Sequence, residues 1–139
     1  MRYLFVLAFG LTVIACNQQP ECKAPGLAGN PPDSELTLYM RHLETDVKGW
    51  RETVAQGGTV EYQPAMFDSM FTATPTDGKI GDSVLFNNLG NLFKQEVQAL
   101  STSTPEDLSN HYNLMVTACV NCHRNFCPGP IKRIEKLKL

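Results

Sequence analysis

Apolar side chains recur at steps of four and three residues along three stretches of this chain, and this spacing constrains its fold more than any other feature. An α-helix turns once in about 3.6 residues, so such steps place side chains on one face of a helix. Each stretch is therefore predicted to be an amphipathic helix. The three sets are Leu36, Met40, Leu43, Val47, Trp50 and Val54; Phe86, Leu89, Phe93, Val97 and Leu100; and Leu108, Tyr112, Met115, Cys119, Cys122 and Phe126.

Capping and breaking residues fit the ends of these helices. Asp33 or Ser34 can cap the first helix, and the glycine pair at 57–58 ends it. The next long helix is predicted to start near residues 82–83. The last should start at Thr104, where proline follows at the first helical position and acidic residues lie in the first turn.

The remaining segments are short. Residues 64–71 are predicted to form a short helix between the first and second long ones, with its methionine and phenylalanine side chains facing inward. Residues 58–62 alternate too weakly to predict a strand. The tail over residues 131–139 is a candidate for one more short helix. Amphipathic helices joined by short connections predict an all-α, up-down four-helix bundle with a short second helix.

The N-terminus reads as an export signal rather than as part of the fold. One arginine precedes an uncharged apolar run that ends at Ala15, too short to span a bilayer. The sequence Val13-Ile14-Ala15-Cys16 resembles the lipobox of bacterial lipoproteins, in which the cysteine becomes the lipidated N-terminal residue. We therefore expect a signal peptide over 1–15, a lipidated tether over 16–32 and a folded domain over 33–139. An ordinary signal peptide with an incidental Cys16 is the alternative.

Composition narrows the class of protein further. The chain has 12 Lys and Arg against 14 Asp and Glu, a net charge of −2, and it is 42% hydrophobic. A nucleic-acid-binding protein would be basic, and a disordered chain would be less hydrophobic and more highly charged. We expect no nucleic-acid partner. No nucleophile and base stand in a recognisable catalytic motif, so an enzyme is not expected either.

The chemistry of the chain is concentrated in Cys119-Val120-Asn121-Cys122-His123, a C-x-x-C-H motif at the end of the last long helix. This motif is the attachment signature of c-type haem. Two thiols three residues apart share a helical face, where each can form a thioether with a haem vinyl group. The histidine that follows can bind the iron as the proximal axial ligand. We expect one covalent haem c on Cys119 and Cys122, with His123 as iron ligand.

Three other interpretations of the motif are open. A structural zinc site normally needs a second cysteine or histidine pair, and no pair with such spacing is present. A thioredoxin-like redox pair would open a helix after a strand, whereas this one closes a helix. The motif could also be a chance sequence on a buried helix face. Export from the cytoplasm favours haem.

A C-terminal haem motif on an exported four-helix chain resembles the cytochrome c-prime family, including its low-spin relatives. The family's local pattern, a haem motif followed by an aromatic residue, is matched by Cys119, Cys122, His123 and Phe126. The resemblance implies that the residue opposite His123 comes from the first helix. Met40 is the candidate distal iron ligand, and Leu36, one turn earlier, is the alternative that leaves iron five-coordinate.

Two functions follow from this resemblance. The first is electron transfer through haem iron, with redox proteins as partners and a periplasmic or cell-envelope location at a bacterial membrane. The second is binding of nitric oxide or carbon monoxide at five-coordinate iron. A third interpretation is a structural lipoprotein whose motif is never metallated. A homodimer is a candidate assembly, and the sequence leaves the oligomeric state open.

Two cysteines are left over once Cys16, Cys119 and Cys122 are assigned. They are Cys22 in the tether and Cys127 at the end of the last long helix. Disulfides persist outside the cytoplasm, and in an up-down bundle the two residues lie near the same end. A Cys22–Cys127 bridge is predicted, with two free thiols as the alternative.

Overall fold

The computed structural model describes residues 32–139 except 79 and 81–82, and these residues form helices and loops without a strand. Residues 58–62 are accordingly not a strand. The expectation of an all-helical chain is confirmed. The elements are α1 (Glu35–Ala55), the 3₁₀-helix η1 (Pro64–Phe67), α2 (Asp68–Thr72), α3 (Val84–Ser101), α4 (Leu108–Phe126) and α5 (Ile131–Glu135).

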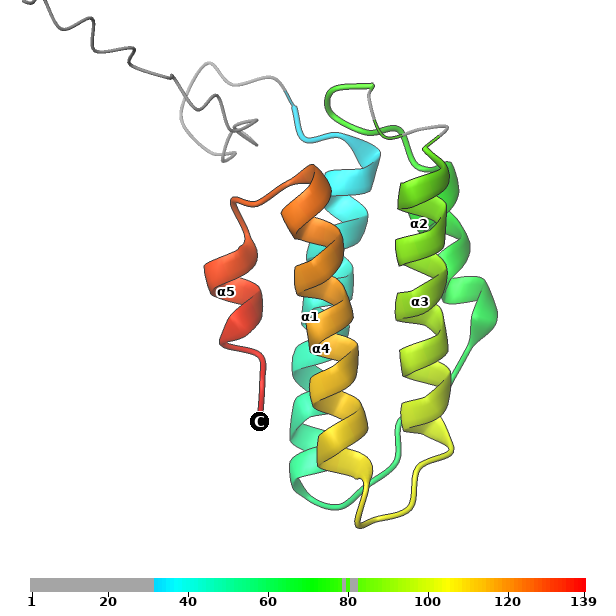
Figure 1. The fold of residues 1–139 in the computed structure, drawn as a ribbon, viewed down its shortest axis with the longest axis vertical. Helices are drawn as coiled ribbons and strands as arrows, with labels where there is room; N and C mark the ends of the chain where they lie inside the picture. The colour runs from blue at the N-terminus through cyan, green and yellow to red at the C-terminus, as the bar shows by residue number, and fades with distance from the viewer. Residues whose placement is uncertain (1–31, 79, 81–82) are drawn as a thin grey trace, which may run out of the picture.

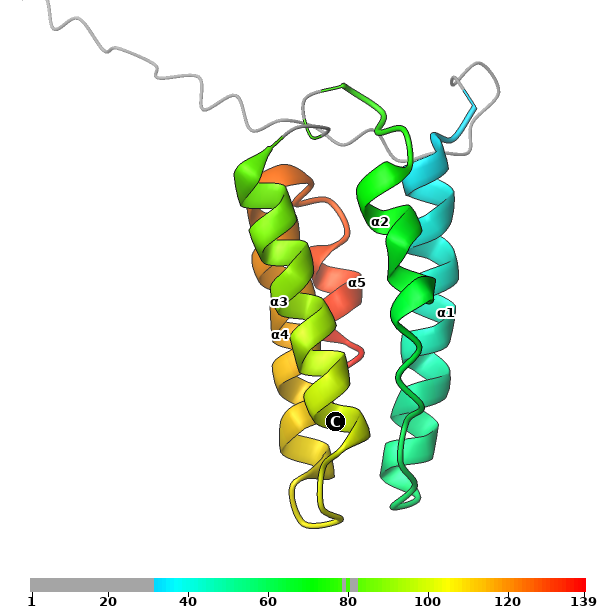
Figure 2. The ribbon, with the colours of Figure 1, turned by 90° about the vertical axis from the view of Figure 1, so that its right-hand side faces the viewer.

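The helices run alternately up and down along one long axis. Figures 1 and 2 show α1 descending, η1 and α2 rising, α3 descending, α4 rising and α5 descending. Both α1 and α3 lie antiparallel to α4, whereas α5 lies on the far side of α4 from α3. The short second helix is confirmed as η1 and α2. The candidate helix in the tail over residues 131–139 is present as α5.

Side-chain capping fixes the start of two long helices. The Ser34 hydroxyl accepts a hydrogen bond from the N–H of Thr37 at 3.2 Å, and the Ser83 hydroxyl accepts one from the N–H of Phe86 at 3.2 Å. Of the two candidate caps of α1, Ser34 is therefore the one used, while Asp33 pairs with Arg41 at 2.6 Å. Past the end of α1, Gly57 adopts φ +77°, which glycine reaches without steric cost.

The predicted start of α4 at Thr104 is wrong. The helix begins at Leu108, because Thr104 closes a turn in front of it. The Thr104 carbonyl accepts from the N–H groups of Asp107 and Leu108 at 3.0 and 3.1 Å, and its hydroxyl donates to the Asp107 carboxylate at 3.1 Å. Pro105 therefore lies in a turn and not in the first turn of the helix.

The core follows the predicted apolar faces with two departures. On α3, Leu89 is only half-buried and Gly90 is buried instead, because the Phe71 ring and the Met70 sulfur fill the space beside Gly90. On α4, burial extends beyond the predicted face, to Val116 and Val120 on one side and to Ala118 on the other. The largest fully buried side chains are Tyr112, Phe67, Leu100, Leu108, Met115, Val47, Val97 and Val116.

Helix α5 is held against the bundle by apolar side chains that are buried at regular intervals. Ile134 and Leu137 are buried and Ile131 packs against the core, so every third residue of this segment faces inward. The backbone carbonyls near its end are also bound, because the Tyr112 hydroxyl lies 3.0 Å from the Leu137 oxygen and the Arg51 guanidinium donates to Lys138 at 3.3 Å.

Candidate functional site

The C-x-x-C-H motif occupies the C-terminal half of α4, as its position in the predicted helix requires. Cys119 and Cys122 are free thiols, partly buried and packed against the hydrophobic core. His123 follows on the same face and is also partly buried. The helix thus presents two thiols and one imidazole to a largely apolar environment.

A hydrogen bond fixes the proton of the imidazole. The Nδ1 atom of His123 lies 2.9 Å from the carbonyl oxygen of Cys119, one turn earlier. A carbonyl can only accept, so Nδ1 carries the proton and Nε2 keeps its lone pair. Burial lowers the pKa of His123, which favours the neutral ring. A neutral imidazole with Nε2 available is the form that binds a metal ion.

Burial acts on the two thiols as well. It raises the pKa of Cys119 to about 12 and that of Cys122 to about 11, with the neighbouring thiol adding to the shift at Cys119. Both groups are therefore neutral thiols near neutral pH. Neutral buried thiols are poor nucleophiles, which speaks against a thiol–disulfide catalyst at this pair.

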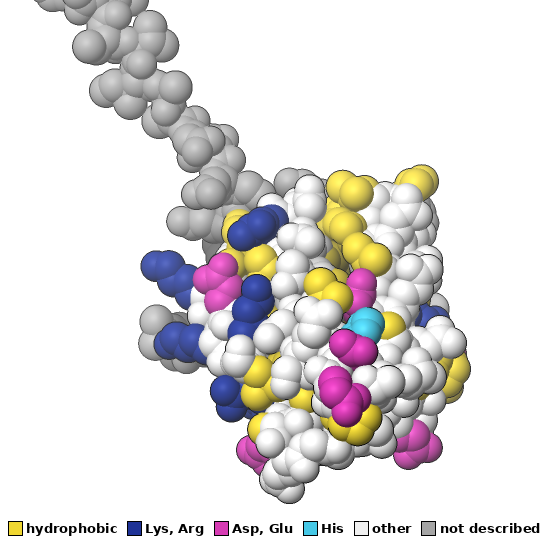
Figure 3. Space-filling view, turned by 60° about the horizontal axis from the view of Figure 1, so that its bottom comes forward, with side chains coloured by type: hydrophobic (Ala, Val, Ile, Leu, Met, Phe, Trp, Pro, Cys, Tyr) yellow, Lys and Arg dark blue, Asp and Glu magenta, His cyan; other side chains and the backbone are white. Residues whose placement is uncertain are grey.

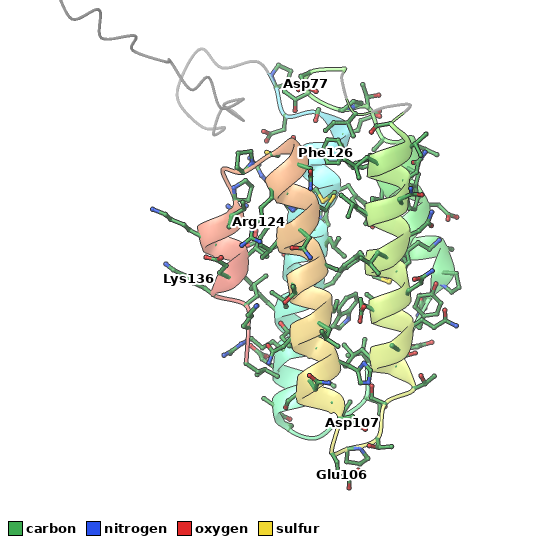
Figure 4. All side chains as sticks on the ribbon, viewed as in Figure 1. Asp77, Glu106, Asp107, Arg124, Phe126 and Lys136 are labelled. Atoms are coloured by element: carbon green, nitrogen blue, oxygen red, sulfur yellow. The ribbon has the colours of Figure 1, made fainter. Side chains whose placement is uncertain are left out.

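Aromatic rings enclose one side of the motif. Phe126, one turn after Cys122, meets Phe86 of α3 edge-on with 5.5 Å between ring centroids, and Phe86 meets Phe71 in the same manner at 6.4 Å. Figure 4 labels Phe126 near the upper end of α4. The three rings link α4, α3 and α2 and keep this side of the motif apolar.

Helix α5 and α1 close the other side. Arg133 of α5 pairs with Glu44 of α1 at 3.0 Å, and Lys48 pairs with the same carboxylate at 2.8 Å. The positive charge of Arg133 is close enough to His123 to contribute to its lowered pKa. No local pattern points to Arg133 and Glu44 as site residues, because they are far apart in the sequence and meet only in the fold.

The structure brings Met40 to the same end of the molecule as the motif. Met40 lies one turn before Glu44 on α1, is half-buried and packs against the core. Its neighbour Tyr39 faces η1 instead, where its hydroxyl donates to the Met66 carbonyl at 3.1 Å. Leu36 is buried, and its N–H donates to the Thr74 carbonyl at 3.1 Å.

The remaining predicted site residues divide between described and undescribed parts of the chain. Cys127 ends α4, and its N–H donates to the His123 carbonyl at 2.8 Å. Cys127 is disulfide-bonded. Its predicted partner Cys22 lies outside the described residues, so the pairing stays a prediction. Cys16 also lies outside them.

The described residues hold no cluster of three or more His, Cys, Asp or Glu side chains that could bind a metal ion. The motif itself supplies one imidazole and two thiols, which is the set of side chains that a covalent haem uses. None of the helices described is long and apolar enough to cross a membrane.

Comparisons with protein-family models, with curated proteins and with solved structures yield no match for this chain.

Proposed function

We propose that this chain is a monohaem c-type cytochrome that transfers electrons at a bacterial membrane. The observation that carries the proposal is the hydrogen bond from His123 Nδ1 to the Cys119 carbonyl inside a C-x-x-C-H sequence. It leaves Nε2 available beside two neutral thiols at the end of a well-packed helix. Bound haem would supply a one-electron couple at iron.

The chain's own residues would hold such a group and control its surroundings. Cys119 and Cys122 would form the two thioethers, and His123 would be the proximal ligand. The Phe126–Phe86 contact keeps one side of the motif apolar, and α5 covers another side. Low exposure to water and fixed ligand orientation are the protein's means of setting a haem potential.

Electron transfer and gas binding differ in the residue opposite His123. Met40 would be the distal ligand in the electron-transfer candidate, because a bound methionine would close the iron to added ligands and raise its potential. The gas-binding candidate is favoured by one observation, the burial of Leu36 where Met40 is only half-buried. A leucine in that position cannot ligate, which leaves iron open to nitric oxide or carbon monoxide.

Intact mass tests the haem. Protein produced in a host with c-type maturation machinery should be heavier than its apoprotein by one haem, and the double variant Cys119→Ser with Cys122→Ser should lose both thioether bonds and with them the added mass. Cys127→Ser is the matched control, because Cys127 lies outside the motif and its loss should leave the added mass in place. Purified protein with no added mass would overturn the proposal.

The proposed location rests on Cys16 and is tested separately. A lipidated Cys16 would hold the domain at the non-cytoplasmic side of a membrane, since two or three acyl chains suffice for stable anchoring. Cys16→Ser should release the protein into the soluble fraction. If the unmutated protein is already in the soluble fraction, the lipobox interpretation is wrong and an ordinary signal peptide takes its place.

A further inference from the structure

Positive charge gathers on one side of this molecule, at and around α5. Residues 124–139 contain five Lys or Arg and one Glu, a formal charge of +4, while the whole chain carries −2. The rest of the chain therefore carries −6. Figure 3 shows most of the visible Lys and Arg side chains on one side, and Figure 4 labels Arg124 and Lys136 on the side of α5. We define the α5 basic face as Arg124, Lys132, Arg133, Lys136 and Lys138, all exposed.

The burial pattern of this segment does not explain its positive charge. The inward positions of the segment are the apolar Ile134 and Leu137, which the exposed lysines do not replace. Arg133 pairs with Glu44, but Lys132 and Lys136 have no ion pair within the part of the chain that the structure describes. Clustered unpaired charges repel one another and lower the stability of the folded chain. Binding to an acidic partner would offset this repulsion.

The face adjoins the candidate haem site. Helix α5 packs directly on α4, and the Tyr112 hydroxyl of α4 reaches the Leu137 carbonyl at 3.0 Å. Arg124 of the face directly follows His123 in the last turn of α4. A molecule seated on α5 would therefore lie next to the proximal side of the site, with one short helix between them.

We propose that the α5 basic face docks the acidic face of a redox partner protein, and that electrons enter and leave the chain on this side. The inference rests on the proposed electron-transfer function and adds the chemistry of the partner. Exposed lysines suit this role, because they accelerate oriented encounter with an anionic surface without requiring a tight complex.

Small redox ions of opposite charge probe the face in the holoprotein. Ferrous protein is mixed with hexacyanoferrate(III), a trianion that takes one electron and becomes hexacyanoferrate(II), while the haem iron becomes ferric. Stopped-flow rates are measured over a range of ionic strength. Tris(phenanthroline)cobalt(III), a trication, serves as the oppositely charged oxidant. If the net negative charge of the protein governs the reaction, added salt should raise the rate with the anionic oxidant by screening repulsion. If electrons leave through a basic face, added salt should lower that rate by screening attraction.

Two variants with the same change in net charge separate the face from the whole molecule. Lys132→Gln with Lys136→Gln removes two charges from α5. Gln95→Glu with Gln98→Glu lowers the net charge equally on exposed positions of α3, which lies on the other side of α4. We expect salt to slow hexacyanoferrate(III) in the unmutated protein. At low ionic strength the α5 variant should be about tenfold slower, and the α3 variant should change by less than about twofold.

Several results would overturn the inference. Equal slowing of the two variants would mean that net charge governs the rate. Unchanged rates in the α5 variant, together with its loss of binding to phosphatidylglycerol vesicles, would mean that the face meets a lipid surface. Both results require a holoprotein, so they leave the proposed function standing. If the purified chain carries no haem, the proposed function itself is contradicted, and no rate can be measured.

Discussion

The hydroxyl of Tyr112 lies 3.2 Å from the carbonyl oxygen of Val47 and thereby joins α4 to the middle of α1. The same oxygen lies 3.0 Å from the Leu137 carbonyl, so one phenolic proton is shared between two acceptors. Tyr112 is fully buried, and burial raises its pKa to about 12. The hydroxyl therefore stays protonated at all ordinary pH values and holds three segments together.

Tyr112→Phe should lower the free energy of unfolding by about 1–2 kcal/mol, because two buried carbonyls lose a donor while the ring still fills its space. Denaturant unfolding would show a lower midpoint with an unchanged slope. Tyr39→Phe is the matched control, since its hydroxyl makes one bond, to Met66, in a partly buried position. It should cost less than Tyr112→Phe. Equal stability of Tyr112→Phe and the unmutated protein would contradict this account.

Met40→Leu should change the spin state of the oxidised holoprotein from low to high and allow carbon monoxide to bind the reduced form. The reason is that the proposed thioether ligand would be lost with little change in side-chain volume, a substitution that usually costs less than about 1.5 kcal/mol. Visible and near-infrared absorption provide the measurement, because a sulfur–iron band should disappear.

Met66→Leu is the control for this experiment, because Met66 is half-buried and packs against the core from η1. It should keep the low-spin spectrum. A high-spin spectrum in the unmutated protein would instead favour Leu36 opposite His123 and move the function to gas binding.

Glu35 should titrate below its ordinary pKa of 4.5, because its carboxylate accepts from the Thr74 N–H at 2.9 Å and from the Thr74 hydroxyl at 2.8 Å. A depressed pKa means that these bonds stabilise the folded state fully above pH 4.5. Their contribution is lost as the pH falls through the folded-state pKa. Carboxyl NMR should report a pKa below 4.5, and Thr74→Ala should raise it only in part, since the N–H remains. Glu35→Gln should flatten the acid side of the stability profile, and an unchanged profile would count against this role.

Two helical glycines should respond oppositely to alanine. A Cβ on Gly49 of α1 meets nothing within 4 Å, so Gly49→Ala should stabilise the protein by up to about 1 kcal/mol through helix propensity. A Cβ on Gly90 would lie 2.7 Å from the Phe71 ring and 3.1 Å from the Met70 sulfur. Gly90→Ala should therefore cost about 1–3 kcal/mol in thermal or chemical unfolding. Stabilisation by both substitutions would show that Phe71 moves aside freely.

The sequence predicts those features that depend on neighbours along the chain. The spacing from Leu36 to Val54 predicts α1, and Ser34 predicts its cap, because both act within one helix. The position of the C-x-x-C-H motif on a helix follows in the same way. The predicted start of α4 is wrong because the Thr104 hydroxyl can either cap a helix or bond within a turn. In the structure it donates to the Asp107 carboxylate within a turn.

Contacts between distant segments are beyond such patterns. Gly90 is buried because Phe71 and Met70 fill the space beside it, which no property of α3 alone reveals. The Arg133–Glu44 pair beside His123 needs α1 and α5 to meet. A lysine- and arginine-rich tail gives no sign of which side of the molecule it covers until Ile134 and Leu137 are buried.

The position of α5 also sets an order of assembly. Arg51 and Lys138 are separated by 87 residues in the sequence, and their hydrogen bond forms only after the whole intervening segment is available. A five-residue helix is too short to be stable alone, so α5 must dock on a surface that α1 and α4 have already built. During folding, the side of α4 that carries His123 therefore stays uncovered until α5 docks. That interval leaves Cys119, Cys122 and His123 accessible to modification before the C-terminal residues close over them.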